Sequence, residues 1–257
     1  MSHIRVENLD KHYESREGRV LALTGVDVAV EKGEFVSIVG PSGCGKSTLL
    51  YILGGFLRPD AGVVEVAGKP VVAPGLDRGV VFQEYALFPW LTVAQNIAYG
   101  LTNTGMAVAQ RASVVERFVQ MIGLGGFENR YPRELSGGMK QRVAIARTLA
   151  CDPQILLLDE PLGSLDALTR EVMQDELLRI WNATRKTVVM VTHDVNEAVY
   201  LSQRVLVMSR RPGRMAEEFR VQVDRGQGRE AVMLSAEFNA IRNQVWLSVR
   251  RRAAEPA

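Results

Sequence analysis

A glycine-rich run in the first quarter of the chain has the residue types and spacing needed to hold phosphate. It matches the pattern G-x-x-x-x-G-K-[ST] in full, and with the next residue it reads Gly40, Pro41, Ser42, Gly43, Cys44, Gly45, Lys46, Ser47 and Thr48. Glycines let backbone N–H groups turn toward phosphate oxygens, and a following helix adds partial positive charge. Lys46 is expected to reach the β- and γ-phosphates, Ser47 to bind Mg²⁺ and Thr48 to contact the α-phosphate.

Two carboxylates follow a second apolar run, Ile155–Leu158, which predicts a buried strand. Ligands of open α/β sheets bind at the ends of strands. Asp159 is therefore expected to bind Mg²⁺, and Glu160 to orient or deprotonate the water that attacks a γ-phosphate. The alternative for this pair alone is a helix cap or surface charge. The phosphate-binding pattern in the same chain favours catalysis.

A second candidate anion site precedes the helical pattern that ends near Leu149. Ser136 is a good helix N-cap, and Gly137 and Gly138 allow a ligand to approach the backbone closely. These residues and the helix start would hold a second γ-phosphate. The alternative is a flexible loop.

Five segments together resemble the ATP-hydrolysing subunits of ABC transporters. They occur in the family's order, cover residues 1 to about 210, and comprise Tyr13, Gln83, Leu135–Arg142, Ser164–Asp166 and His193.

The resemblance implies the roles of these residues. ATP would bind between the phosphate loop of one subunit and Ser136–Gly138 of a second subunit, in a head-to-tail homodimer. Tyr13 would stack on adenine, and Asp166 would lie at the dimer seam. The implied catalytic residues are Lys46, Gln83, Glu160 and His193, and the implied Mg²⁺ ligands are Ser47, Gln83 and Asp159. The alternative for His193 is a purely structural role, and the alternative for Tyr13 is a place in the core or on the surface.

The hydrophobic pattern predicts the elements that position these residues. Strands are expected at Ile4–Leu9, Val26–Val30, Phe35–Val39, Val63–Val66, Val80–Phe82, Ile155–Leu158, Thr187–Val191 and Val205–Met208. Helices are expected after Lys46, from Thr92 to Leu149, and from Ala167 to Trp181. The order favours an α/β fold of the P-loop ATPase kind, with a parallel-containing sheet, an N-terminal antiparallel β part and a helical insertion over about 84–150. The ATPase domain would cover 1–225, and a mostly helical extension 226–257.

Composition limits the classes of function. The 257 residues are 47% hydrophobic and 23% charged with a net charge of +2, so nucleic acid is not expected as a partner. Cys44 and Cys151 lack metal-ligand spacing, and we expect reduced thiols. Since no apolar run approaches the roughly 20 residues of a membrane span, transport would require another chain.

The segment Phe82–Val93, the motifs around Asp166 and His193, and Ser209–Arg214 are similar to those of bacterial nitrate, sulfonate and taurine importers. This resemblance implies a peripheral subunit on the cytoplasmic face of the membrane, serving transmembrane permease subunits and, indirectly, an extracytoplasmic solute-binding protein. The apolar residues Tyr85, Leu87, Phe88 and Trp90 would form a groove for a permease helix, or else pack the subdomain's own core.

The sequence argues against two other classes of function. A DNA-repair relative would carry long heptad coiled coils, and a ribosomal relative usually carries two cassettes in one chain; neither pattern is present. A regulatory protein that binds ATP without turnover would not need Glu160 and His193.

Overall fold

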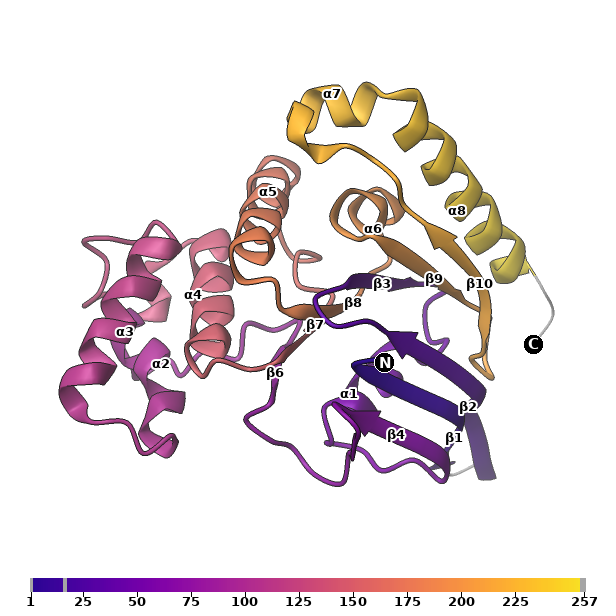
Figure 1. Ribbon diagram of the computed structural model, residues 1–257, viewed down its shortest axis with the longest axis horizontal. Helices are drawn as coiled ribbons and strands as arrows, with labels where there is room; N and C mark the ends of the chain where they lie inside the picture. Colours follow the sequence, from indigo (N-terminus) through magenta and orange to yellow (C-terminus); the bar gives the residue numbers. More distant parts are fainter. Residues whose placement is uncertain (1, 16–17, 255–257) are drawn as a thin grey trace. The chain divides into compact units, whose positions relative to one another are not determined.

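The computed structural model describes residues 2–15 and 18–254, and the chain forms two compact units. The first unit comprises residues up to Gly75 together with those from Thr187 onward, and the second comprises Leu76–Lys186. Figure 1 labels the elements of both units.

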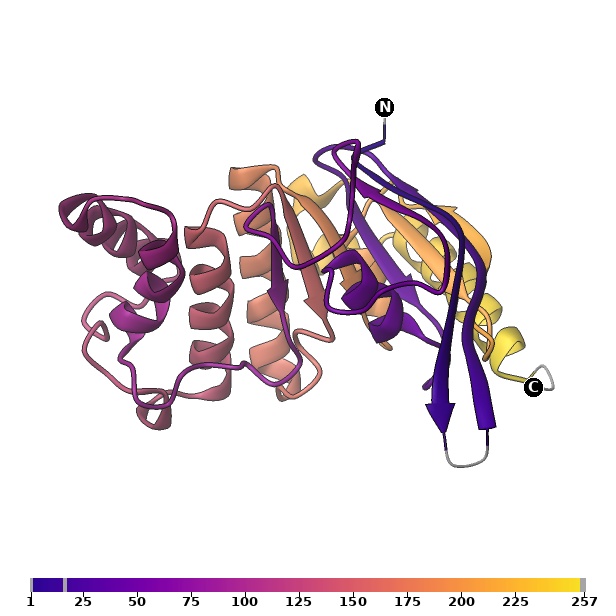
Figure 2. The same ribbon diagram turned by 90° about the horizontal axis from the view of Figure 1, so that it is seen from below.

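An antiparallel sheet opens the first unit. Its strands are β1 (Ile4–Ser15), β2 (Gly18–Val30), β4 (Ala61–Val66) and β5 (Lys69–Pro70), in the spatial order β2-β1-β4-β5. The hairpin of β1 and β2 is the long indigo pair in Figure 2. Both strands exceed the predicted lengths because their backbone pairing continues past the alternating apolar residues, as far as Ser15 opposite Gly18.

Four further strands of the first unit carry the parallel pairing. They are β3 (Phe35–Val39), β8 (Thr187–Val191), β9 (Arg204–Met208) and β10 (Met215–Arg220). β3 pairs in parallel with both β8 and β9, and β10 pairs antiparallel with β9. Every residue of β3 and β8 is buried, as expected for strands covered on both faces. β10 was not predicted, because an edge strand reading Met-Ala-Glu-Glu-Phe-Arg has no apolar run.

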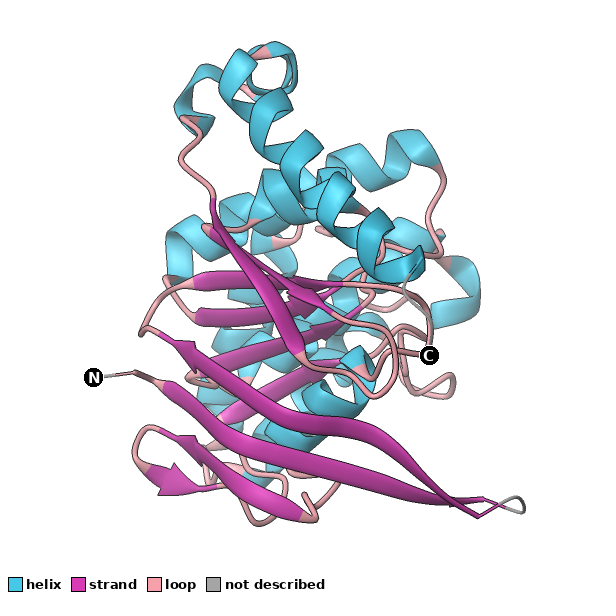
Figure 3. Cartoon of the chain, turned by 90° about the vertical axis from the view of Figure 1, so that its right-hand side faces the viewer, coloured by secondary structure: helices cyan, strands magenta, loops and turns pink. Residues whose placement is uncertain are grey.

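Helices complete the first unit. α1 (Lys46–Leu53) follows β3, and α6 (Val195–Leu201) follows β8. After β10 come a 3₁₀ turn (Arg225–Gln227), α7 (Arg229–Leu234) and α8 (Ala236–Ala254), in the stretch where a mostly helical extension was expected. α8 packs against α6, β9 and β10, as Figures 1 and 3 show.

The second unit holds the predicted helices. Strands β6 (Arg78–Val81) and β7 (Ile155–Asp159) pair in parallel. Between them in the chain come α2 (Val93–Tyr99), a 3₁₀ turn (Gly100–Asn103), α3 (Val108–Met121), a second 3₁₀ turn (Pro132–Glu134) and α4 (Gly137–Ala150). α5 (Ala167–Thr184) follows β7. The predicted N-cap Thr92 is confirmed, since its hydroxyl accepts from the Gln95 amide while the Gln95 side chain accepts from the Thr92 amide.

The predicted α/β class, with an antiparallel N-terminal sheet, parallel strands and helices between β6 and β7, is confirmed. Across residues 2–15 and 18–254, no helix is both long enough and apolar enough to cross a bilayer.

Candidate functional site

The predicted phosphate loop joins the buried strand β3 to helix α1 in the first unit. Gly45, the N-cap of α1, has φ of +104°, a conformation that glycine adopts without strain, and no side chain caps the helix. The Lys46 Nζ donates hydrogen bonds to the carbonyl oxygens of Gly40 (2.9 Å) and Pro41 (3.0 Å), and the side chain is buried. The ammonium is therefore held inside the loop, as a phosphate cradle requires.

Cys44 lies in the wall of this loop and is fully buried. Burial raises the pKa of the Cys44 thiol, and the neighbouring Lys46 only partly opposes the shift. The thiol consequently stays neutral at physiological pH, so no thiolate competes with a phosphate for the positive charge of Lys46.

The parallel pairing of β3 and β8 brings His193 to the edge of the sheet from which the phosphate loop leaves. Ile38 is opposite Val191, and the Thr192 amide donates to the Ile38 carbonyl (3.2 Å). His193 follows directly and is exposed. Next, Asp194 caps α6 by accepting from the Asn196 and Glu197 amides. This capped turn holds the backbone on which His193 is carried.

Tyr13, on β1, contacts the last residue of the phosphate loop, Thr48. Its hydroxyl is 3.2 Å from the Thr48 Oγ1, and 40% of the residue is exposed. A half-exposed aromatic ring tied to the end of the phosphate loop is suited to stack on a nucleotide base. The alternative of a core tyrosine is excluded by this exposure.

In the second unit the acidic pair follows β7. Asp159 is only 3% exposed, whereas Glu160 is partly exposed and has φ of +43°. A non-glycine residue in this region costs on the order of 1–3 kcal/mol and marks a constrained backbone. Gln83 Nε2 lies 3.5 Å from Glu160 Oε2, so the structure brings these two predicted catalytic side chains together.

The oxygen donors predicted to bind a metal fit Mg²⁺ in chemistry. A hydroxyl, an amide oxygen and one buried carboxylate, from Ser47, Gln83 and Asp159, are hard ligands. Mg²⁺ in nucleotide sites takes one or two such protein groups and keeps waters and phosphate oxygens for the rest.

Two further predicted residues of the second unit are helix caps. The Ser136 hydroxyl accepts from the Met139 amide (3.3 Å) at the start of α4. Asp166 accepts from the Thr169 amide (3.0 Å) at the start of α5, and that hydrogen bond holds the pKa of the Asp166 carboxyl below its usual range. A serine hydroxyl that accepts from an amide keeps its own hydrogen for a ligand, so capping leaves Ser136 able to bind an anion.

Gly138 has a packing role that the sequence did not indicate. A Cβ at this position would lie 2.7 Å from the Thr169 Cγ2, so the N-terminal turns of α4 and α5 approach closely only with glycine here. A Cβ at Gly137 would likewise lie 3.1 Å from the Tyr85 hydroxyl oxygen and 3.3 Å from the Leu165 Cδ2.

The segment after Gln83 is anchored by residues that sequence reasoning missed. The Arg147 guanidinium donates to the carbonyl oxygens of Ala86 (2.6 Å) and Tyr85 (3.4 Å) and lies 5.6 Å from the centre of the Phe88 ring. The Tyr85 hydroxyl is hydrogen-bonded to the Ser164 Oγ (3.0 Å). A lone arginine in a helix gives no sequence signal for this contact.

Of the apolar residues predicted to form a groove, Tyr85, Leu87 and Phe88 are half-buried and Trp90 is exposed. The Phe88 ring packs on Tyr99, with ring centres 4.2 Å apart, while Trp90 is 69% exposed. Phe88 thus packs against both Tyr99 and Trp90, and Trp90 offers an exposed surface; the groove for a permease helix stays a prediction. A separate groove between α2 and α3 has a mixed lining of apolar residues, polar residues and the charged residues Arg111, Glu116 and Glu128.

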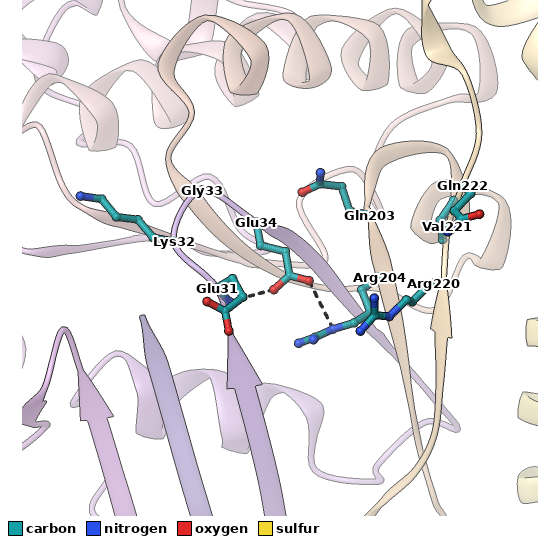
Figure 4. A pocket seen from close by; sticks show the side chains of 9 residues that line it. All are labelled: Glu31, Lys32, Gly33, Glu34, Gln203, Arg204, Arg220, Val221 and Gln222. Carbon is teal, nitrogen blue, oxygen red and sulfur yellow. Dashed lines mark hydrogen bonds and ion pairs between the residues drawn. The ribbon is translucent and has the colours of Figure 1, made fainter. Parts of the chain in front are cut away.

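A polar hollow in the first unit contains none of the predicted site residues (Figure 4). The Arg204 Nε lies 3.4 Å from a Glu34 oxygen and 3.6 Å from a Glu218 oxygen, and the Gln203 side chain accepts from the Phe35 amide. The hollow is therefore lined by side chains that pair with one another near the start of β3.

Comparisons with known proteins agree on one family. The family model described as ABC transporter matches residues 23–163. The chain is 48% identical over 219 residues to the nitrate import ATP-binding protein of Synechocystis, covering 85% of this chain and 82% of the relative. It is 47% identical over 220 residues to the taurine import ATP-binding protein of Pelagibacter ubique, covering 85% and 83%. A solved dimeric ATP-binding cassette in a post-hydrolysis state, bound to ADP and Pi, has a TM-score of 0.75 at 34% identity and covers 85% of this chain and 99% of its own.

The contact between Gly138 and Thr169 gives a testable prediction about stability. Gly138→Ala should destabilise the protein by about 1–3 kcal/mol, because the added methyl overpacks the α4–α5 contact. The check is the urea midpoint of unfolding. Adding Thr169→Ser removes the clashing Cγ2 and should restore most of the loss. Equal midpoints for wild type and Gly138→Ala would contradict the predicted clash.

Proposed function

The chain belongs to the ABC transporter family, and from that premise we propose that it is the ATP-binding and ATP-hydrolysing subunit of an importer of small solutes. The observation that carries the proposal is the loop at residues 40–48, with Lys46 held inside it by two backbone carbonyls. That arrangement suits the triphosphate of ATP.

In this proposal the site residues divide the work of phosphoryl transfer. Lys46 and the amides of the loop bind the β- and γ-phosphates, and Tyr13 stacks on adenine. Ser47, Gln83 and Asp159 would hold Mg²⁺, which would supply charge stabilisation at the phosphates. Glu160 orients or deprotonates the attacking water, and Gln83 and His193 hold the reacting groups in place. Catalysis is then mainly positioning and charge stabilisation.

The second anion device supports a homodimer as the working state. Ser136, Gly137 and Gly138 lie at the start of α4 and would bind the γ-phosphate held by a second copy of the chain. Asp166 would lie at the seam between the copies. ATP then favours the closed dimer because it adds contacts that only the closed state makes.

The open surface of the second unit supports docking of a permease. Trp90 and the groove between α2 and α3 offer apolar area beside charged Arg111, Glu116 and Glu128. An amphipathic helix of a membrane subunit fits such a groove, with its apolar side inward and polar residues at the rim. Trp90 lies in the segment that begins at Gln83, and Arg147 holds the backbone of that segment at Tyr85 and Ala86.

The relatives support a small anion or organic solute as the cargo. Those compared are named for the import of nitrate and of taurine. We infer an assembly in which this subunit, bound to transmembrane permease subunits, works on the cytoplasmic face of the cell membrane. An extracytoplasmic binding protein would deliver the solute, so the solute would not contact this chain.

The role of Glu160 can be tested by one substitution. Glu160→Gln should retain ATP binding but lower ATP hydrolysis about 100-fold or more, since a general base contributes about that much. Light scattering with Mg²⁺ and ATP should then report a lasting dimer, and phosphate release gives the rate. Glu84→Gln, an exposed carboxylate near Gln83, is the matched control and should leave the rate unchanged. Hydrolysis at the wild-type rate by Glu160→Gln would show that this carboxylate is not catalytic.

The docking surface can be tested with a charged side chain at its exposed aromatic residue. Trp90→Glu should weaken association with the permease about thirtyfold or more, as loss of a central aromatic anchor does, without changing ATP affinity. Copurification of the complex measures the association. Trp246→Glu makes the same change at another exposed tryptophan and should leave assembly intact. Normal assembly of the Trp90→Glu complex would place the docking surface elsewhere.

A further inference from the structure

The carboxylate of Asp60 is tied to the strand that carries Tyr13. Asp60 Oδ2 accepts from the His12 amide at 2.5 Å, and Lys11 Nζ lies 3.3 Å from Oδ1. The Asp60 amide also donates to the Asp10 carbonyl at 2.9 Å. One residue therefore holds three successive positions of β1, immediately before Tyr13.

This clamp lies where β1 loses one of its two neighbouring strands. The pairing of β1 with β4 ends at Asp10 opposite Ala61, whereas the pairing with β2 continues to Ser15. The register of β1 also shifts between Leu9 and Lys11 and between Lys11 and His12. Past this point the β4 side of β1 lacks a ladder partner, and the Asp60 carboxylate supplies the acceptor for the His12 amide.

Tyr13 is the first residue beyond the clamp, and it contacts both the end of the phosphate loop and Lys11. Its hydroxyl reaches Thr48 at 3.2 Å, and the Lys11 ammonium that pairs with Asp60 lies 5.9 Å from the centre of the ring. Asp60 and Thr48 belong to one continuous stretch, which runs from the phosphate loop through α1 and back to β1. The stretch thus fixes Tyr13 relative to the loop at two points.

We propose that Asp60 is a positioning residue for the nucleotide base, setting the distance from the Tyr13 ring to the phosphate loop through His12 and Lys11. The inference rests on the proposed function, because it assumes that Tyr13 stacks on the base. Asp60 itself does not contact the nucleotide. Its effect is therefore confined to the part of the binding free energy that depends on the base.

The clamp is permanent at physiological pH. The hydrogen bond from the His12 amide, with the contribution of Lys11, holds the pKa of the Asp60 carboxyl below its usual range. A group with a lowered pKa stays ionised well above that value, so the contact does not switch on or off between about pH 6 and 8.

The test compares a ligand that has a base with one that lacks it. The ligands are a non-hydrolysable imido analogue of ATP and inorganic tripolyphosphate, each with Mg²⁺, and the full chain is used at equilibrium. Tyr13→Ala should weaken the analogue about tenfold through lost stacking and leave tripolyphosphate unchanged. Asp60→Ala should weaken the analogue about fourfold and also leave tripolyphosphate unchanged. Asp60→Asn keeps one acceptor for the His12 amide and should restore most of the affinity.

The double variant separates positioning from a general loss of structure. If Asp60 acts through Tyr13, Asp60→Ala should weaken the analogue no further once Tyr13→Ala is present. The matched control is Asp27→Ala, since Asp27 Oδ1 accepts from the Asn8 amide (2.8 Å) elsewhere on β1. That variant should bind both ligands as the wild type does.

Three results would overturn the inference while leaving the proposed function intact. They are an equal loss of both ligands in Asp60→Ala, an unchanged affinity for the analogue, and additive losses in the double variant. Failure of the wild-type chain to bind the analogue at all would instead reject the proposed function, and the inference with it.

Discussion

Helix α1 begins without a side chain to cap it, and the nucleotide-binding end of the first unit depends on that constraint. Its N-cap is Gly45, whose positive φ turns the end of the phosphate loop into the first turn of the helix. The helices α4, α5 and α6 begin instead at Ser136, Asp166 and Asp194, each of which accepts from an amide of the first turn. The partial positive charge at the start of α1 is therefore left for an anion, and Lys46 adds a full charge beside it.

The caps of the other helices show that one residue can serve both folding and function. The sequence suggests a γ-phosphate contact for Ser136 and, by resemblance, a dimer-seam position for Asp166, and each residue also caps a helix in the structure. Truncating Ser136 should remove a cap contribution of about 1 kcal/mol as well as any contact with a ligand. Loss of activity in such a variant is informative only when stability is measured beside it. Gly138, which lies against Thr169, belongs to the same group.

The segment that begins at Gln83 connects the exposed Trp90 with the proposed reaction centre, and hydrogen bonds from other elements hold it in place. Arg147 holds its backbone from α4, and the Tyr85 hydroxyl reaches Ser164, two residues before the cap of α5. A permease that pulls on Trp90 would therefore act on a segment whose backbone is restrained by hydrogen bonds. Packed and hydrogen-bonded segments of this kind shift between discrete arrangements, which suits a protein that must couple hydrolysis to movement elsewhere.

The sequence by itself determined the chemistry and the order of the elements. The spacing of residues 40–48 implies a phosphate loop, and continuous apolar runs at Phe35–Val39 and Thr187–Val191 imply buried strands, because both signals are local. Only the tertiary structure decided which side chains support that chemistry. Arg147 contacts carbonyls 61 and 62 positions away, and Asp60 accepts from an amide 48 positions away. Such contacts depend on the register of strands and the approach of helices, and no periodic pattern along one chain encodes them.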